Sequence, residues 1–136
     1  MQHLHFNHLA ILVSALIQWF LGALWYSPAL FAKPWMAMVF VRKDSVKKNS
    51  MVMGMIASFV GSVVTSLMTA HVVIWSNAST YPAGMLIGFI VWLGFIAAPL
   101  AASYIYEGRP FKLFAINTGY WLVGLLVTGG LLAVWR

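Results

Sequence analysis

Four long apolar runs divide the chain, and each is long enough to cross a membrane as a helix. They cover residues 9–26, 51–75, 82–104 and 111–135. About 20 helical residues span the hydrocarbon core of a bilayer, and none of the runs has Lys, Arg, Asp or Glu in its interior. None alternates polar and apolar residues as the strands of a membrane barrel do. The pattern predicts an all-α fold, a four-helix transmembrane bundle in a single domain over residues 1–136.

A shorter apolar and aromatic segment follows the first run. It covers residues 29–41 and contains Phe31, Trp35 and Phe40. Short segments of this kind are typical of helices that lie along the lipid headgroups. We therefore expect a short interfacial helix after the first span.

Small or polar residues recur at helical spacing in every run. The stripes are Ser14, Gln18, Gly22 and Tyr26 in the first run, Gly54, Ser58, Gly61, Thr65 and Thr69 in the second, Gly84, Gly88, Phe95, Pro99 and Ala102 in the third, and Asn117, Tyr120, Gly124 and Thr128 in the fourth. Small residues let helices approach closely, and hydroxyls and amides bond between them. We expect the stripes inside the bundle and the Leu, Ile and Val faces toward lipid. Because four stripes exceed what one bundle needs, we also expect a homo-oligomer, most simply a dimer or trimer.

Composition agrees with a membrane protein. The chain is 62% hydrophobic and 7% charged, whereas a soluble domain is about half apolar and about a quarter charged. A soluble fold of this size could not bury so much apolar surface. The chain has no cysteine, which excludes disulfides, thiolate metal sites and thiol nucleophiles.

The charged residues lie in the loops, and the net charge is +6. The loop before the second run carries Lys33, Arg42, Lys43, Lys47 and Lys48 against Asp44, the third loop has Glu107 and Arg109 with Lys112 just beyond, and Arg136 ends the chain. The loop between the second and third runs is uncharged. Loops rich in Lys and Arg stay in the cytoplasm, so we expect both termini outside it. We expect the bilayer, another copy or a larger membrane complex as partners, and no nucleic acid.

The inner ends of the helices gather most of the candidate chemistry. Six residues should lie there at similar depth: Tyr26, Tyr104, Glu107, Arg109, Asn117 and Tyr120. An amide, three phenols, a carboxylate and a guanidinium suit a polar site that recognises a small ligand. The alternative is that Glu107 pairs with Arg109 in the loop and that the aromatic residues form the interfacial belt. We expect a ligand-binding site here and call these six residues the inner mouth.

Two further polar side chains are expected within the membrane. Gln18 lies near the middle of the first run, where an amide is costly unless paired, and should hold helices together. His71 lies about five residues from the outer end of the second run, and an ionisable residue there is by default a functional suspect. Its alternative role is a hydrogen bond near the helix end. We do not expect it to belong to the inner mouth.

Catalytic and metal-binding patterns are otherwise missing. The sequence has no Gly-rich phosphate loop, no paired carboxylates and no Ser/His/Asp set with a convincing acid. His3, His5 and His8 could present imidazoles to a metal ion, but no acid or cysteine lies near them. We expect no metal ion, no cofactor and no catalytic residue.

Two sequence blocks resemble a family of small membrane proteins. The first is Leu21-Gly22-Ala23-Leu24-Trp25-Tyr26-Ser27-Pro28 with Leu30-Phe31 and Lys33-x-Trp35, and the second is Glu107-Gly108-Arg109-Pro110 with Lys112-Leu113-Phe114 and Asn117-x-Gly119-Tyr120. Together they resemble a bacterial family known as domain of unknown function 1761, over nearly the whole chain. The resemblance implies a multi-pass protein of the bacterial inner (plasma) membrane and no particular activity. Asn117 stands where the resemblance leads us to expect an acid, which weakens a proton-coupled mechanism.

Three classes of function remain open. The first, which we favour, is a homo-oligomeric channel or transporter for a small solute or ion. The second is an accessory or scaffold subunit of a larger membrane complex. The third is a membrane enzyme that acts on a lipophilic substrate, which a one-sided aromatic groove open to lipid would favour.

Overall fold

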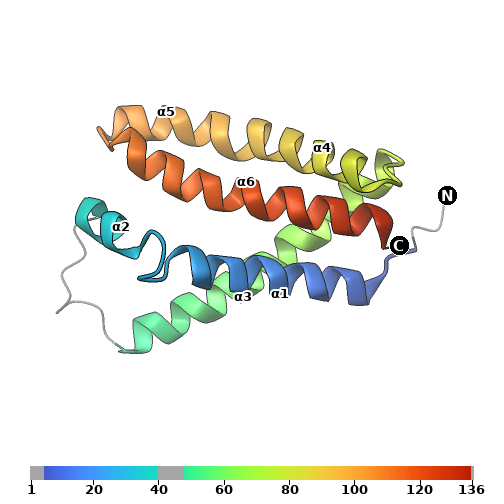
Figure 1. Cartoon of the computed structure of the whole chain (residues 1–136), viewed down its shortest axis with the longest axis horizontal. Coiled ribbons are helices and arrows are strands. Elements are labelled where there is room, and N and C mark those ends of the chain that lie inside the picture. The colour runs from blue at the N-terminus through green and yellow to red at the C-terminus, as the bar shows by residue number, and fades with distance from the viewer. Residues whose placement is uncertain (1–4, 40–47, 136) are drawn as a thin grey trace.

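The structure, a computed structural model, describes residues 5–39 and 48–135 (Figure 1). Its helices are α1 (His8–Trp25), α2 (Ala32–Val39), α3 (Lys48–Trp75), α4 (Tyr81–Trp92), the π-helical η2 (Leu93–Ala97), α5 (Ala98–Tyr106) and α6 (Phe111–Val134). The described residues contain no strand, so the predicted all-α fold is confirmed. His3, Phe40, Arg42, Lys43, Asp44, Lys47 and Arg136, which carry sequence-based predictions, lie outside the described residues.

Among the described residues, four helices are long and apolar enough to cross a membrane. They are His8–Trp25, Met51–Trp75, Tyr81–Tyr106 and Phe111–Val134. The third is one continuous rod made of α4, η2 and α5 (Figure 1). These spans agree with the four apolar runs, and the protein is membrane-embedded. The predicted short helix after the first span is present as α2.

Local sequence explains where these helices begin. The Asn7 side chain accepts a hydrogen bond from the main-chain nitrogen of Ala10 at 3.1 Å and caps α1. Thr80 caps α4 in the same way at 3.3 Å. Such caps satisfy main-chain donors that the first helical turn leaves free. Between α5 and α6, Gly108 has φ +66°, a conformation that glycine adopts without the steric cost of a Cβ atom.

The pair α4 and α6 forms the tightest contact of the bundle. A Cβ atom on Gly84 would collide with the main-chain oxygen of Gly129, and one on Gly88 would collide with that of Leu125. These glycines therefore allow the two backbones to approach closely. α6 also packs against α1 and α3, which places it at the centre of the bundle.

The stripe predicted for the third span is wrong beyond Gly88. Phe95 is 78% exposed, and Pro99 and Ala102 are also exposed, whereas Ala97 and Tyr104 are buried. The physical reason is η2, because a π-helical turn adds a residue to the helix. The inward face is consequently displaced along the sequence in α5, and a spacing based on 3.6 residues per turn loses it.

The stripe predicted for the second span is also largely wrong. Gly54 and Gly61 have open space around them, and the buried polar residues of α3 are Ser62, Ser66 and Thr69. Figure 1 shows the reason: the first half of α3 diverges from the other long helices, so no neighbouring helix packs closely on Gly54 or Gly61. The stripes of α1 and α6 do face inward, with Ser14, Gln18, Tyr120, Gly124 and Thr128 buried.

The expectation that the Leu, Ile and Val faces point to lipid holds for many side chains of α1, α3 and α4 but fails at several positions, most of them on α6. Leu125 and Val73 are 0% exposed, and Leu132 is buried as well. Because α6 is surrounded by other helices, it has no face wholly free for lipid. Leu9, Leu12 and Leu24 of α1, by contrast, are exposed as expected.

Candidate functional site

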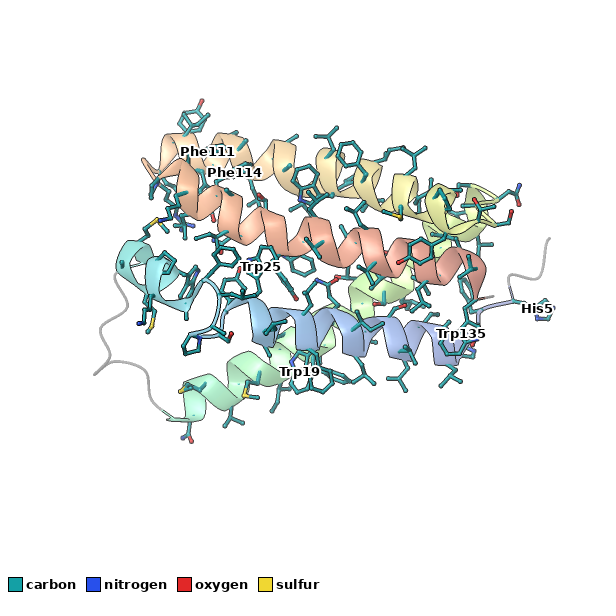
Figure 2. All side chains as sticks on the ribbon, viewed as in Figure 1. His5, Trp19, Trp25, Phe111, Phe114 and Trp135 are labelled. Carbon is teal, nitrogen blue, oxygen red and sulfur yellow. The ribbon has the colours of Figure 1, made fainter. Side chains whose placement is uncertain are left out.

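Asn117 is the centre of the inner mouth. The Tyr26 hydroxyl donates to Asn117 Oδ1 at 2.8 Å, and Asn117 Nδ2 donates to the Tyr104 hydroxyl at 2.6 Å. Tyr26 caps the end of α1, Tyr104 lies in α5, and Asn117 lies near the start of α6. One amide therefore ties three membrane-spanning segments together at one end of the bundle. Figure 2 marks this end by Trp25, Phe111 and Phe114, and the opposite end by Trp135.

Tyr120 extends this cluster toward the middle of the bundle. Its ring lies 5.8 Å from that of Tyr26 in an edge-on arrangement, and its hydroxyl donates to the main-chain oxygen of Gln18 at 3.0 Å. Gly22 makes room for the ring, because a Cβ atom there would lie 3.0 Å from the Tyr120 hydroxyl. Burial raises the pKa of the Tyr26 hydroxyl to about 12, with smaller contributions from Tyr120 and Tyr104. Tyr26 is therefore a hydrogen-bond donor at any physiological pH.

Glu107 and Arg109 form an ion pair at the rim of the inner mouth. Arg109 Nε lies 2.6 Å from Glu107 Oε2, and both side chains are about half exposed, at 48% and 49%. The same guanidinium lies over the Tyr104 ring, 5.1 Å from its centre. Glu107 therefore pairs with Arg109, as the alternative interpretation of the sequence expected, and Arg109 also contacts the aromatic cluster through Tyr104. A half-exposed pair of this kind adds little stability.

A cavity of about 400 Å³ opens between α2, the turn after α5 and the start of α6. It is lined by Trp35, Met38, Val39, Glu107, Gly108, Arg109, Pro110, Leu113 and Asn117. An asparagine amide has two N–H donors and an oxygen with two lone pairs. The two tyrosines use one donor and one lone pair, so Asn117 can still offer one of each. The cavity thus combines a fixed amide, a guanidinium and a carboxylate.

Three tryptophans join this end of the bundle, and sequence reasoning gave them no site role. Trp25 donates from Nε1 to the main-chain oxygen of Ile116 at 2.9 Å, and Trp92 donates to that of Thr118 at 2.8 Å. Trp35 lies edge-on to Tyr26, with ring centres 5.6 Å apart. Its place in the first sequence block could have indicated a site role for Trp35. However, Trp35 also lies in an apolar segment, where a tryptophan is typical of the interfacial aromatic belt.

Tyr26 and Tyr120 both line a second hollow. It is a groove of about 570 Å³ between α1 and the first half of α3, lined by Trp19, Phe20, Gly22, Ala23, Tyr26, Met51, Gly54, Met55, Ser58 and Tyr120. Trp19 closes one side by donating from Nε1 to the main-chain oxygen of Met55 at 3.3 Å. Its lining is almost wholly apolar, in contrast to the cavity beside Asn117. Tyr26 therefore connects the two hollows, because it lines the apolar groove and bonds to Asn117, which lines the polar cavity.

The remaining polar residues predicted from sequence lie elsewhere. His71 lies in the second half of α3, where its Nδ1 donates to the main-chain oxygen of Leu67 at 2.8 Å and its ring packs against Phe6 and Trp75. Gln18 is 1% exposed and faces Gly124 in the middle of the bundle. Within residues 5–39 and 48–135 no three His, Asp or Glu side chains lie close enough to hold a metal ion.

The fold and these contacts define a small multi-pass membrane protein with four apolar spans and a polar cluster at one end of the bundle. The chain matches the family model described as "Protein of unknown function (DUF1761)" over residues 9–133. It belongs to that family, and the resemblance of its two sequence blocks is confirmed. No curated protein matches the chain, and no solved structure does so either.

Proposed function

We propose that the inner mouth is the recognition site of a channel or transporter for a small polar solute. The observation that carries the proposal is the position of Asn117. Its amide is fixed by Tyr26 and Tyr104 and also lines the 400 Å³ cavity. A rigid polar group in a concave site is what small-molecule recognition requires, and fixing it beforehand lowers the entropic cost of binding.

The free groups of Asn117 indicate the class of solute. One N–H and one oxygen lone pair on the same amide suit a molecule with a donor and an acceptor side by side, such as a primary amide or a carboxylic acid. Glu107 and Arg109 neutralise each other at the rim, so together they add no net charge. The site therefore favours a neutral or zwitterionic solute over a simple ion.

The chain would have a defined orientation in the membrane and would form a homo-oligomer. The basic loops support a bacterial inner (plasma) membrane location with both termini outside the cytoplasm, and the inner mouth would then face the cytoplasm. The first half of α3 supports a homo-oligomer, because its apolar side chains are exposed and its glycines Gly54 and Gly61 have open space in front of them. A second copy could pack there as closely as α4 packs on α6. Mass measurement in nanodiscs tests the assembly, and a monomer at high concentration would contradict it.

A thermal-shift experiment in nanodiscs tests solute recognition. The probes are acetamide, urea, glycine, glutamine and acetate, each added to the full chain and to Asn117→Leu. Ser103→Ala is the matched control, because its hydroxyl is exposed on α5 at the same end of the bundle. We expect at least one amide or zwitterionic probe to stabilise the wild type and Ser103→Ala but not Asn117→Leu. Equal responses in all three proteins, or none in any, would contradict the proposal.

The groove between α1 and α3 supports a second candidate function, the binding of a lipophilic substrate. It is apolar, aromatic and about 570 Å³ in volume, within the range of small-molecule sites. Replacement of Gly54 by Trp should fill it. We expect this variant to lose binding of a fluorescent fatty-acid probe, while Gly94→Trp, on the open side of η2, retains it. Equal binding by both variants would rule out the groove.

A further inference from the structure

The middle of the bundle contains three buried polar atoms that have no hydrogen-bonding partner among the described residues. They are Ser14 Oγ, Gln18 Nε2 and Gln18 Oε1. Ser14 is 0% exposed and Gln18 is 1% exposed. The two residues lie one turn apart on the same face of α1. Buried polar groups are almost always bonded to something, and inside a bilayer no bulk water is at hand to serve.

The neighbouring groups on α3 and α6 explain why the protein itself does not satisfy these atoms. The Gln18 amide lies against Gly124, where a Cβ atom would collide with it. The Tyr120 hydroxyl faces the side chains of Gln18 and Ser62, but it gives its proton to the main-chain oxygen of Gln18. Ser62 donates to the main-chain oxygen of Ser58 at 2.9 Å.

The chemistry of the missing partner follows from this arrangement. The Tyr120 and Ser62 hydroxyl protons are already used, so Gln18 Oε1 needs a donor from elsewhere. The Ser14 hydroxyl needs an acceptor for its proton, so a single molecule between Gln18 Oε1 and Ser14 Oγ must donate to the first and accept from the second. The sequence of α1 has no Lys, Arg, Asp or Glu, and those of α3 and α6 have only Lys48 and Lys112, in their first turns, so an ion at mid-bundle would find no opposite charge. The partner is therefore neutral, and water is the smallest molecule that meets these conditions.

We infer that Gln18 and Ser14 form a binding site for water in the middle of the membrane. Gln18 precedes Tyr26 by eight residues, which places it about 12 Å deeper along α1 at 1.5 Å per residue. Tyr120 connects the two levels, since its ring contacts Tyr26 and its hydroxyl bonds to Gln18. The site lies beyond the inner mouth and does not depend on the solute recognition proposed there.

Nuclear magnetic resonance of the full chain in nanodiscs tests this site. The chain has only two glutamines, Gln2 and Gln18, so labelling with ¹⁵N-glutamine gives two side-chain amide signals. The signal missing from Gln18→Leu belongs to Gln18. We expect cross-relaxation between the Gln18 amide protons and water in the wild type, and a loss of most of its intensity in Ser14→Ala.

Two variants distinguish two possible sources of this cross-relaxation: bound water, and a nearby hydroxyl proton that exchanges with water. Tyr120→Phe removes the hydroxyl beside the Gln18 side chain, and Ser62→Ala removes a hydroxyl beside that of Tyr120. We expect the water cross-relaxation to persist in both. Three results would overturn the proposed water site. They are the absence of this cross-relaxation from the wild type, its disappearance in either variant, and its full intensity in Ser14→Ala. The glutamine spectrum of each variant reports whether that variant is folded, and the wild-type result decides the question by itself.

Discussion

The Tyr26 hydroxyl donates a 2.8 Å hydrogen bond to Asn117 Oδ1 and thereby joins the end of α1 to the start of α6, 91 residues later. The same amide donates to Tyr104 at 2.6 Å. Because hydrogen bonds of this kind fix both partners, the orientation of Asn117 is set by helices on either side of it. The structure of this end of the bundle and the proposed solute recognition therefore depend on the same side chain.

A double-mutant cycle measures the coupling between these two residues. We expect Tyr26→Phe to lower the free energy of unfolding by about 1 kcal/mol, the net value of a typical hydrogen bond. Asn117→Leu should cost about 1–3 kcal/mol, because it leaves two tyrosine hydroxyls without a partner. Unfolding in mixed micelles gives both values. Tyr106→Phe is the control, since Tyr106 is 92% exposed. Full additivity of the two changes would show that the hydrogen bond adds nothing.

The ion pair at the rim should affect recognition more than stability. Glu107 and Arg109 are about half exposed, and exposed pairs contribute at most about 1 kcal/mol. We expect Arg109→Gln to change the unfolding free energy by less than that, and to shift the preference of the site away from carboxylate-bearing probes. The thermal-shift panel described above measures both effects. A large loss of stability with an unchanged probe preference would assign Arg109 a structural role only.

Close packing of α4 on α6 should be sensitive to a single methyl group. Gly88→Ala would place a Cβ atom against the main-chain oxygen of Leu125, and overpacking of this kind costs about 1–3 kcal/mol. Gly94→Ala, on the same rod, meets nothing within 4 Å and should be neutral or slightly stabilising. Thermal unfolding of the two variants in the same detergent makes the comparison. Equal stability would contradict the tight α4–α6 contact.

Hydropathy predicted the spans because the bilayer imposes one length and one polarity on every crossing helix. The grouping of the six inner-mouth residues could also be predicted, because helix ends on the same side of a membrane lie at a similar depth. The buried faces of α3 and α5 could not be predicted in the same way. The π-helical turn Leu93–Ala97 changes the inward register of the rod without a recognisable sequence signal. The divergence of α3 depends on which helices surround it, a property that the periodicity of one segment does not encode.

Labelling of single cysteines tests the orientation, because the chain has no cysteine of its own. Ser79, between α3 and α4, and Tyr106, the last residue of α5, are both exposed and lie at opposite ends of the bundle. We expect Ser79→Cys to react with an impermeant maleimide in intact cells and Tyr106→Cys to react only after permeabilisation. The reverse pattern would place the inner mouth outside the cytoplasm. Reaction of both in intact cells would show that the cells leak.

Substitutions at Gln18 and Gly124 should have coupled effects on the free energy of unfolding. A Cβ atom on residue 124 would collide with the Gln18 amide, so we expect Gly124→Ala to lower the unfolding free energy by about 1–3 kcal/mol. Gln18→Ala removes the amide and frees the space that the new methyl group needs. The double variant should therefore be more stable than Gly124→Ala alone, which is a coupling that neighbouring residues show and distant ones do not. Gly61→Ala, which meets nothing within 4 Å, is the control and should be neutral in either background. If Gly124→Ala lowers the unfolding free energy equally with and without Gln18, the new methyl group must collide with something other than the amide. The close contact between Gly124 and the Gln18 side chain would then be contradicted.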